Sequence, residues 1–267
     1  MRSYTIQSAI SSNLHFRKSG EGPVVMLLHG FPSNGQLWED TGNRLSSRFT
    51  VIIPDIPGSG SSTLDKEDVS LEDMAHALKE ICVSAGIEKL VVVGHSMGGY
   101  ISLAFHELFP DLVAGLSLVH SSASADNDEK KETRRKSIRL IENGGKRPFV
   151  EQMIPALFDE GFARENPGLV KRQIAEGMQL SERSMVAFYK AMINRPDRTS
   201  NLPGATIPVQ WIIGESDKVI PVSTAMEQCQ LASVNFVSVY QNTGHMSMLE
   251  KPDTLYGDLE KFIEHCF

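Results

Sequence analysis

The chain has 267 residues, of which 41% are hydrophobic and 22% charged, the composition of an ordinary globular protein with a sizeable core. Its net charge of −7 argues against a nucleic acid or an anionic membrane surface as binding partner. No apolar run of about 18 residues could span a bilayer, and the first residues lack the apolar stretch of a secretory signal peptide.

The first part of the chain reads as strands of a sheet. Residues 4–6 and 14–18 alternate between polar and apolar side chains, which predicts an antiparallel hairpin at a sheet edge. Residues 24–28 and 51–53 are continuous apolar runs, which are typical of strands buried on both faces in a parallel sheet. Between these runs, residues 37–45 show a helical pattern.

Each of these two apolar runs leads into a loop that contains glycine and proline. The first run continues as residues 29–32 and the second as residues 54–62. We interpret His29 and Asp55, one in each loop, as structural residues that brace the loops rather than as catalytic groups.

A serine lies at the turn between a predicted strand and a predicted helix. Residues 71–85 first show apolar side chains at helical spacing, with Gly86 as the expected C-cap. The strand 90–93 then ends in Gly-His-Ser-Met-Gly-Gly, residues 94–99, and a helical pattern follows. Ser96 is at the apex of this sharp turn, which lifts its hydroxyl clear of the sheet.

The second half of the chain falls into a helical part and a returning sheet. Residues 113–120 predict another strand, so the alternation of strands and helices indicates a doubly wound parallel sheet. Residues 121–201 hold no clear strand and several helical patterns, one of them dense in charges of both signs, as in a solvated helix face. Further strands are predicted over residues 209–213 and 236–240, and a closing helix begins near Pro252.

Five motifs together resemble those of the α/β-hydrolase family, and they occur in that family's chain order. They are the Gly-x-Ser-x-Gly turn at residues 94–98, the His-Gly loop at 29–30, the Asp-x-Pro-Gly-x-Gly-x-Ser loop at 55–62, the Gly-x-x-Asp-x-x-x-Pro segment at 214–221 and the Gly-His pair at 244–245. The resemblance implies an α/β-hydrolase fold, a mostly parallel doubly wound sheet with an inserted helical cap. It implies a core domain of residues 1–120 and 202–267, and a helical cap, or lid, of residues 121–201.

The resemblance also implies a catalytic triad. A serine hydroxyl needs a base to take its proton as it attacks a carbonyl. The family pattern makes Ser96 the nucleophile, His245 the general base and later general acid, and Asp217 the carboxylate that orients the histidine. Glu215 is a competing carboxylate two residues away, and the motif favours Asp217.

Further residues are expected around this triad. The resemblance implies that the backbone N–H groups of Phe31 and Met97 form the oxyanion hole. Apolar residues at helical spacing are usually core, but we expect some in the cap to face substrate. These candidates are Met153, Leu157, Phe158, Met185, Phe188 and Met192. No metal or other cofactor is predicted, because the eight histidines show no ligand spacing and the serine mechanism requires none.

These features predict a serine hydrolase that cleaves small carboxylic esters or lactones of moderately apolar acids. Two alternatives within catalysis stay open, a C–C bond hydrolase of vinylogous diketones and a perhydrolase-like activity. His95 and Met246 stand where such C–C hydrolases often carry asparagine and tryptophan. Both departures make the C–C hydrolase the less favoured alternative. A third alternative is a non-catalytic ligand receptor on the same fold. Ser96 excludes the aspartate-nucleophile mechanism of dehalogenases and epoxide hydrolases.

The cysteines indicate where the protein works. Cys82, Cys229 and Cys266 are odd in number and far apart, which fits reduced thiols better than a disulfide scaffold. We therefore expect a cytoplasmic location. The net charge of −7 favours a monomer or small homo-oligomer. Its expected partner is a small ester-like molecule, and neither a nucleic acid nor a membrane.

Overall fold

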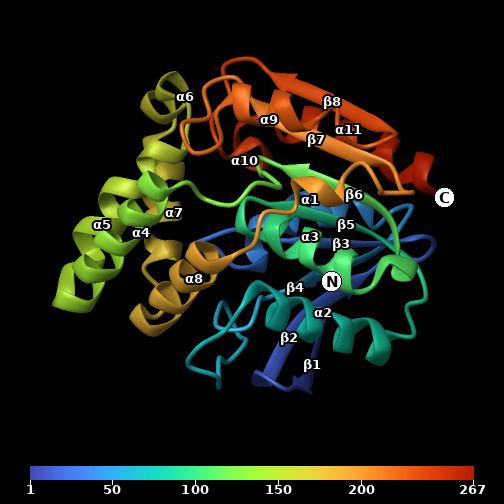
Figure 1. Ribbon diagram of the computed structural model, residues 1–267, viewed down its shortest axis with the longest axis horizontal. Helices are drawn as coiled ribbons and strands as arrows, with labels where there is room; N and C mark the ends of the chain where they lie inside the picture. Colours follow the sequence, from blue (N-terminus) through green and yellow to red (C-terminus); the bar gives the residue numbers. More distant parts are fainter.

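A mixed sheet of eight strands runs through the molecule (Figure 1). The computed structural model describes all 267 residues. The strands are β1 (Arg2–Ser8), β2 (Ser11–Ser19), β3 (Val24–Leu28), β4 (Thr50–Pro54), β5 (Leu90–His95), β6 (Val113–Val119), β7 (Val209–Gly214) and β8 (Asn235–Tyr240). Their order across the sheet is β1-β2-β4-β3-β5-β6-β7-β8.

The sheet is parallel from β4 to β8 and antiparallel at the N-terminal edge. There β1 pairs with β2, and β2 pairs with β4, in antiparallel register. Every residue of β4, β5, β6 and β7 is buried, because helices cover both faces of these apolar strands. The expected mostly parallel, doubly wound sheet with an edge hairpin is therefore confirmed, and β5 lies near its centre.

Eleven α-helices and several short turns of helix connect the strands. The helices are α1 (Glu39–Leu45), α2 (Leu71–Ala85), α3 (Met97–Leu108), α4 (Asp128–Leu140), α5 (Lys146–Met153), α6 (Glu160–Glu165), α7 (Pro167–Gly177), α8 (Glu182–Asn194), α9 (Val222–Gln228), α10 (Ser247–Glu250) and α11 (Pro252–Cys266). The short turns are Gly35–Trp38, Pro110–Leu112, Ile141–Gly145, Pro155–Leu157 and Thr199–Asn201. None of the helices combines the length and apolar character needed to cross a membrane.

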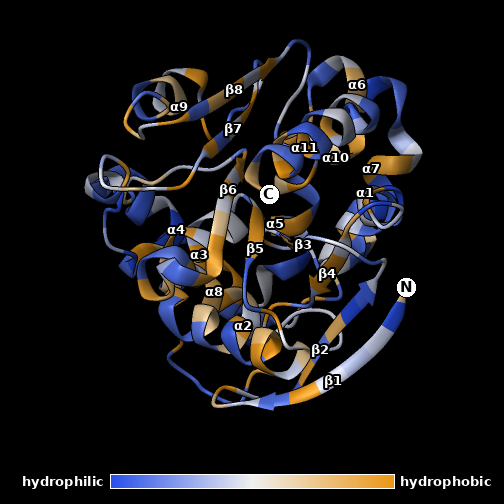
Figure 2. Cartoon of the chain, turned by 90° about the vertical axis from the view of Figure 1, so that its right-hand side faces the viewer, coloured by the Kyte–Doolittle hydropathy of each residue, from blue (hydrophilic) through white to orange (hydrophobic).

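The helices form layers on the two faces of the sheet. Helices α2 and α3 pack together on one face, and α1 and α11 pack together on the other (Figure 2). Residue by residue, α2 follows the sequence signals for a helix. The Ser70 side chain and Asp73 cap its first turn reciprocally, and Gly86 ends it in the left-handed conformation with φ of 65°.

The segment between β6 and β7 is helical, as expected, and contains α4 to α8. We call residues 121–201 the cap segment. Its helices lie beyond the carboxyl ends of the parallel strands (Figure 1), which is where α/β sheets bind ligands. Whether the segment moves as a separate lid remains a prediction.

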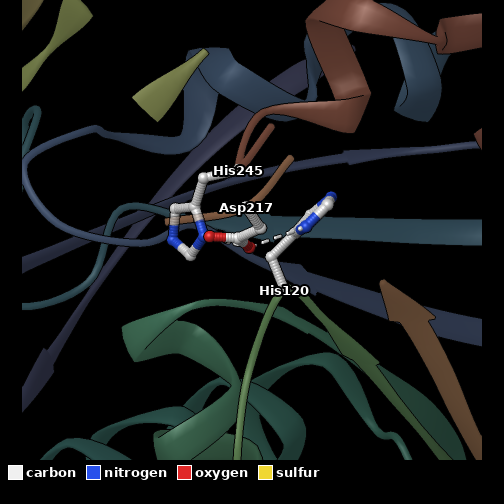
Figure 3. A group of neighbouring side chains, drawn as sticks. All are labelled: His120, Asp217 and His245. Atoms are coloured by element: carbon white, nitrogen blue, oxygen red, sulfur yellow. Dashed lines mark hydrogen bonds and ion pairs between the residues drawn. The ribbon is translucent and has the colours of Figure 1, made fainter. Parts of the chain in front are cut away.

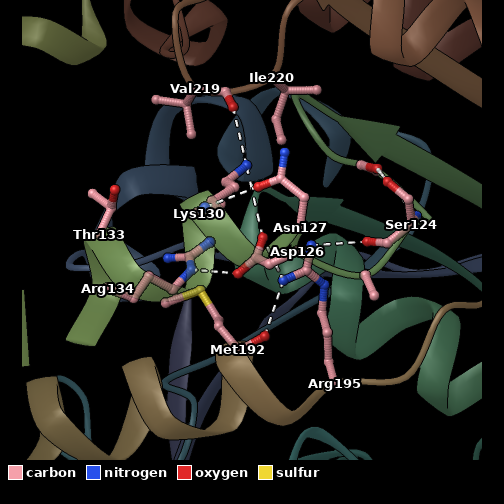
Figure 4. Close-up of polar contacts among 12 residues, drawn as sticks. Ser124, Asp126, Asn127, Lys130, Thr133, Arg134, Met192, Arg195, Val219 and Ile220 are labelled. Atoms are coloured by element: carbon pink, nitrogen blue, oxygen red, sulfur yellow. Dashed lines mark hydrogen bonds and ion pairs between the residues drawn. The ribbon is translucent and has the colours of Figure 1, made fainter.

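A buried ionic cluster ties the two ends of the cap segment together (Figure 4). The side chain of Asp126, near the start of the segment, has no exposed surface and pairs with Arg134 at 2.6 Å and Arg195 at 3.0 Å. Arg195, near the end of the segment, also donates to the carbonyl oxygens of Ser124 and Met192. The entry and exit of the segment are therefore held at one point.

Candidate active site

Ser96 occupies a strained turn between β5 and α3. Its backbone has φ of 51° and ψ of −115°, a conformation that non-glycine residues rarely adopt. The Ser96 N–H donates to Val119 O at 2.9 Å, and its carbonyl oxygen accepts the Ser121 hydroxyl at 2.8 Å. The end of β6 thereby holds the turn in place. Strain of this kind persists only where the surrounding structure enforces it, and it is concentrated at functional sites.

Asp217 and His245 form a close hydrogen-bonded pair (Figure 3). Asp217 follows β7 and His245 follows β8, and Asp217 Oδ2 accepts the Nδ1–H of His245 at 2.7 Å. The other carboxylate oxygen accepts the backbone N–H groups of Val219 and Ile220 at 2.8 and 3.0 Å. Burial alone would raise the pKa of Asp217, but the neighbouring histidines and their hydrogen bonds hold that pKa well below its usual range.

Ser96 and His245 are both nearly buried, with 9% and 2% of their surface exposed. Neither Ser96 Oγ nor His245 Nε2 hydrogen-bonds within the protein, and both atoms keep some contact with solvent. In free enzymes, the hydrogen bonds between catalytic side chains are often long, and they shorten only in the complex with substrate. The structure thus brings Asp217 and His245 together, whereas the contact between His245 and Ser96 remains a prediction.

The loops that would supply the oxyanion hole approach the serine. A Cβ added to Gly30 would lie 3.0 Å from Ser96 Cβ, so the loop after β3 passes directly beside the turn. The next residue is Phe31, whose N–H has no acceptor within the protein. Met97 is the first residue of α3, where helical N–H groups have no intrahelical partner. Both predicted donors are therefore free to bind an oxygen atom, and their role stays a prediction.

The residues interpreted as structural do brace their loops. His29 is fully buried, its Nδ1–H donates to Gly30 O at 3.0 Å, and its Nε2 accepts the Ile56 N–H at 3.1 Å. Asp55 accepts the N–H of Gly35 at 2.9 Å. Burial lowers the pKa of His29, which keeps its ring neutral.

The competing carboxylate of Glu215 lies away from the histidine. Its side chain is exposed, and its Oε2 accepts the N–H of Asn242 at 3.2 Å. Of the two carboxylates, only Asp217 hydrogen-bonds to His245.

The six cap residues expected near substrate are packed in the interior of the cap segment. Five of them are buried and one, Met153, is half-buried. Met153 and Phe149 line a cleft of about 390 Å³ in the cap segment. Phe149 also packs against Phe31, with ring centroids 6.3 Å apart, so the cleft and the proposed oxyanion loop share one aromatic ring. Which of the six residues contact substrate stays a prediction. The five buried residues are Leu157, Phe158, Met185, Phe188 and Met192.

Two functional contacts escaped the sequence patterns. His245 N–H donates to Leu157 O in the cap segment at 2.6 Å. The buried carboxylate of Glu250 accepts the N–H groups of Gly244 and Met246, on either side of the histidine, and that of Asp159 in the cap segment. The histidine loop and the cap segment are therefore fixed to each other. The sequence shows only a glutamate five residues after the histidine, and nothing in the sequence indicates that its carboxylate is buried.

The donor atoms of His120, Asp217 and His245 lie within 4.8 Å of one another, close enough in principle for a metal ion. Their spacing is explained by hydrogen bonds, because both imidazole rings donate to Asp217 Oδ2, at 3.1 and 2.7 Å. A metal would have to displace the two Nδ1 protons that fill this space. The three side chains therefore form a hydrogen-bond network in which each imidazole donates its Nδ1 proton to Asp217.

Comparisons with known proteins agree with the fold. The family model described as alpha/beta hydrolase fold matches residues 23–252. The pimeloyl-[acyl-carrier protein] methyl ester esterase of Vibrio vulnificus is 27% identical over 95% of this chain and 99% of its own length. A thermophilic esterase from Thermogutta terrifontis superposes with a TM-score of 0.93 at 27% identity, covering 100% of this chain and 99% of that one.

A second solved structure shares the fold at lower sequence identity. The enol-lactonase from Burkholderia xenovorans superposes with a TM-score of 0.88 over 96% of this chain and 99% of its own, and at 19% identity it shares the fold alone. The two nearer relatives described above are esterases, which supports the expectation of a carboxylic ester hydrolase. By its sequence match and its sheet topology, this chain belongs to the α/β-hydrolase fold family.

Proposed function

We propose that the protein is a serine hydrolase that cleaves small carboxylic esters or lactones through an acyl-enzyme on Ser96. The observation that carries the proposal is the coincidence of a strained serine after β5 with an Asp217–His245 pair, bonded at 2.7 Å, after β7 and β8. The carboxyl ends of parallel strands meet at one edge of the sheet, so these three loops share one site.

Each residue has a defined task in this mechanism. His245 takes the proton of Ser96 as the hydroxyl attacks the carbonyl carbon of the substrate, and then gives it to the leaving alcohol. Asp217 keeps the proton of His245 on Nδ1, which leaves Nε2 free to accept, and stabilises the imidazolium that forms. The N–H groups of Phe31 and Met97 stabilise the oxyanion, a contribution of about 3 kcal/mol per donor in such sites. Water activated by His245 then hydrolyses the acyl-enzyme.

The substrate class follows from the relatives and the cap segment. Relatives named as esterases support an ester bond as the target. The apolar side chains of the cap segment favour a moderately apolar acyl group. A cytoplasmic location belongs to the same proposal and is supported by three unpaired cysteines.

Turnover of p-nitrophenyl acetate, p-nitrophenyl butyrate and a small lactone tests the proposed function. We expect hydrolysis by the wild type and a loss of at least about 10⁴-fold in kcat for Ser96→Ala and His245→Ala. An alanine variant of the exposed residue Lys190 serves as the control and should keep wild-type rates. A folded wild-type protein that turns over none of these substrates would contradict the proposal, as would full activity in Ser96→Ala.

A further inference from the structure

Two imidazole rings hold the carboxylate of Asp217. Its Oδ2 accepts the Nδ1–H of His245 at 2.7 Å and the Nδ1–H of His120 at 3.1 Å. The rings flank the carboxylate, and they come from different parts of the sheet, since His120 follows β6 and His245 follows β8 (Figure 3). The mechanism proposed above uses only His245. The second histidine requires an explanation of its own.

The backbone of His120 is held in an unusual conformation. Its φ is 50°, in the left-handed region that non-glycine residues rarely occupy. Its N–H donates to Ile212 O at 2.9 Å, which fixes the residue to β7. Gly214 makes room for the ring, because a Cβ there would lie 3.0 Å from His120 Cε1. Several contacts thus combine to aim this side chain at Asp217.

Hydrogen bonding determines which nitrogen of His120 carries its proton. A carboxylate only accepts hydrogen bonds, so the proton is on Nδ1. Nε2 is buried without a partner and carries only its lone pair. Burial lowers the pKa of His120 by more than Asp217 raises it, so the ring is neutral. His120 is therefore a fixed, uncharged N–H donor to the carboxylate.

We propose that His120 is a positioning residue for the catalytic pair, which shares Asp217 Oδ2 with His245 and thereby sets the acid limit of activity. The proposal rests on the proposed function, in which His245 must be unprotonated to accept the serine proton. With His120 in place, both carboxylate oxygens have two donors each, so the carboxylate cannot rotate without losing a hydrogen bond.

His120 and His245 share the negative charge of Asp217, and this sharing gives the direction in which loss of His120 changes the protonation of His245. A carboxylate oxygen that accepts two N–H groups stabilises the charged form of either ring less than it would if it accepted only one N–H group. Without the N–H of His120, Asp217 favours protonated His245 more strongly, and His245 takes up its proton at higher pH. The other titratable groups that face His120 are His95 at the end of β5 and Glu250 in α10, and neither hydrogen-bonds to it.

Two substitutions distinguish the effect of the His120 N–H donor from the effect of the size of its ring. His120→Phe keeps a ring and loses the donor. His120→Asn keeps a donor, because the asparagine Nδ2 corresponds in position to the histidine Nδ1, and asparagine tolerates positive φ. His106→Gln, in the last turn of α3, is the control for replacing a half-buried histidine elsewhere.

Two measurements are made on each variant. NMR titration of the His245 imidazole gives its protonation midpoint directly. The pH dependence of inactivation by a fluorophosphonate gives the acid midpoint of serine reactivity. In His120→Phe we expect both midpoints to rise by about half a pH unit or more. His120→Asn and His106→Gln should keep the wild-type midpoints.

The outcomes separate this inference from the proposed function. Unchanged midpoints in folded His120→Phe would overturn the role of His120, and so would a rise in His120→Asn equal to that in His120→Phe. If the phenylalanine variant does not fold, His120→Leu, which also lacks a donor, is measured in its place with the same expectation. A wild type that the fluorophosphonate does not inactivate would remove the proposed function, and the NMR titration would still decide the role of His120.

Discussion

Ser96 can occupy its turn only because two neighbouring residues have no side chain. A Cβ on Gly98 would lie 2.6 Å from Leu28 O, and a Cβ on Gly94 would lie 2.5 Å from Gly98 O. Cβ atoms do not approach backbone oxygens so closely, and either one would force β3 or α3 away from the serine. The reactive residue therefore depends on close backbone packing around it.

This packing predicts a difference between two glycine substitutions. We expect Gly98→Ala to lower the free energy of unfolding by at least about 2 kcal/mol, because the clash is with backbone that cannot rotate away. Gly257→Ala is the matched control, since a Cβ at this position in α11 meets nothing within 4 Å. Alanine favours a helix over glycine by about 1 kcal/mol, so the control should gain stability. Chemical denaturation compares the two, and equal stabilities would contradict the packing.

The choice between two nearby carboxylates gives a second test at this scale. We expect Asp217→Asn to lower kcat by roughly 10⁴-fold while the protein stays folded, because the amide cannot hold the tautomer and charge that His245 needs. Glu215→Gln should keep wild-type kcat, since Glu215 is exposed and only accepts the N–H of Asn242. Ester hydrolysis by the two purified variants measures this. The reverse pattern would show that the acid is misassigned.

Single residues differ in how far the sequence reveals them. Ser96, Asp217 and His245 could be predicted because each lies in a short motif with its own glycines. His120 and Glu250 could not, because their roles come from contacts between distant segments. His120 bonds to a residue 97 positions away, and Glu250 to the N–H of a residue 91 positions away. No local pattern marks a side chain whose partner is so remote.

At the scale of elements, the two ends of the cap segment are held together by the buried cluster around Asp126. Its carboxylate is paired with Arg134 and Arg195, and both guanidinium groups are largely buried. Burial alone would raise the pKa of Asp126, but the arginines beside it hold that pKa below its usual range. These buried ion pairs therefore hold the two ends of the segment together.

Breaking this cluster should destabilise the protein. We expect Asp126→Asn to lower the free energy of unfolding by about 3 kcal/mol, because it leaves buried guanidinium groups without a counter-charge. Arg139→Gln is the control, since Arg139 pairs with Glu132 on the exposed face of the same helix, α4, and such pairs contribute at most about 1 kcal/mol. Thermal unfolding measures both. A control as damaging as Asp126→Asn would show that burial of the cluster does not matter.

Elements with a distinctive sequence were the ones that could be predicted. Buried parallel strands such as β3 and β4 are short apolar runs bounded by glycine and proline, and their length favours a strand over a helix. Helix α2 has a capping box, one apolar face and a C-cap glycine. The boundaries of the cap helices could not be predicted. Helix α6 has only 6 residues and begins three residues after a short turn, so neighbouring amphipathic patterns run together. Tertiary packing decides where such helices end.

At the scale of the whole molecule, buried neutral histidines make stability depend on pH. Burial lowers the pKa of His29, His95 and His120 below the model-peptide value of 6.5. As the pH falls below 6.5, the unfolded chain binds protons that the native protein does not, so the native state loses stability. Above that pH the effect is absent. Each such histidine contributes a slope of at most about 1.4 kcal/mol per pH unit.

We therefore expect the free energy of unfolding to be constant near pH 7 to 8 and to fall progressively from about pH 6.5 downward. His120→Asn should reduce the slope, because one of the three buried imidazoles is gone. Urea denaturation at a series of pH values measures both proteins. A wild type equally stable at pH 7 and pH 5 would mean that these rings are protonated at little cost in the native state.

Covalent labelling of Ser96 is the most direct test of the proposed chemistry. The protein is incubated with a fluorophosphonate at neutral pH, and the modified residue is located by mass spectrometry of the digested protein. We expect a single adduct on Ser96, none in Ser96→Ala, and strongly slowed labelling in folded His245→Ala. A folded wild-type protein that remains unlabelled, or an adduct on another residue, would contradict a serine activated by His245.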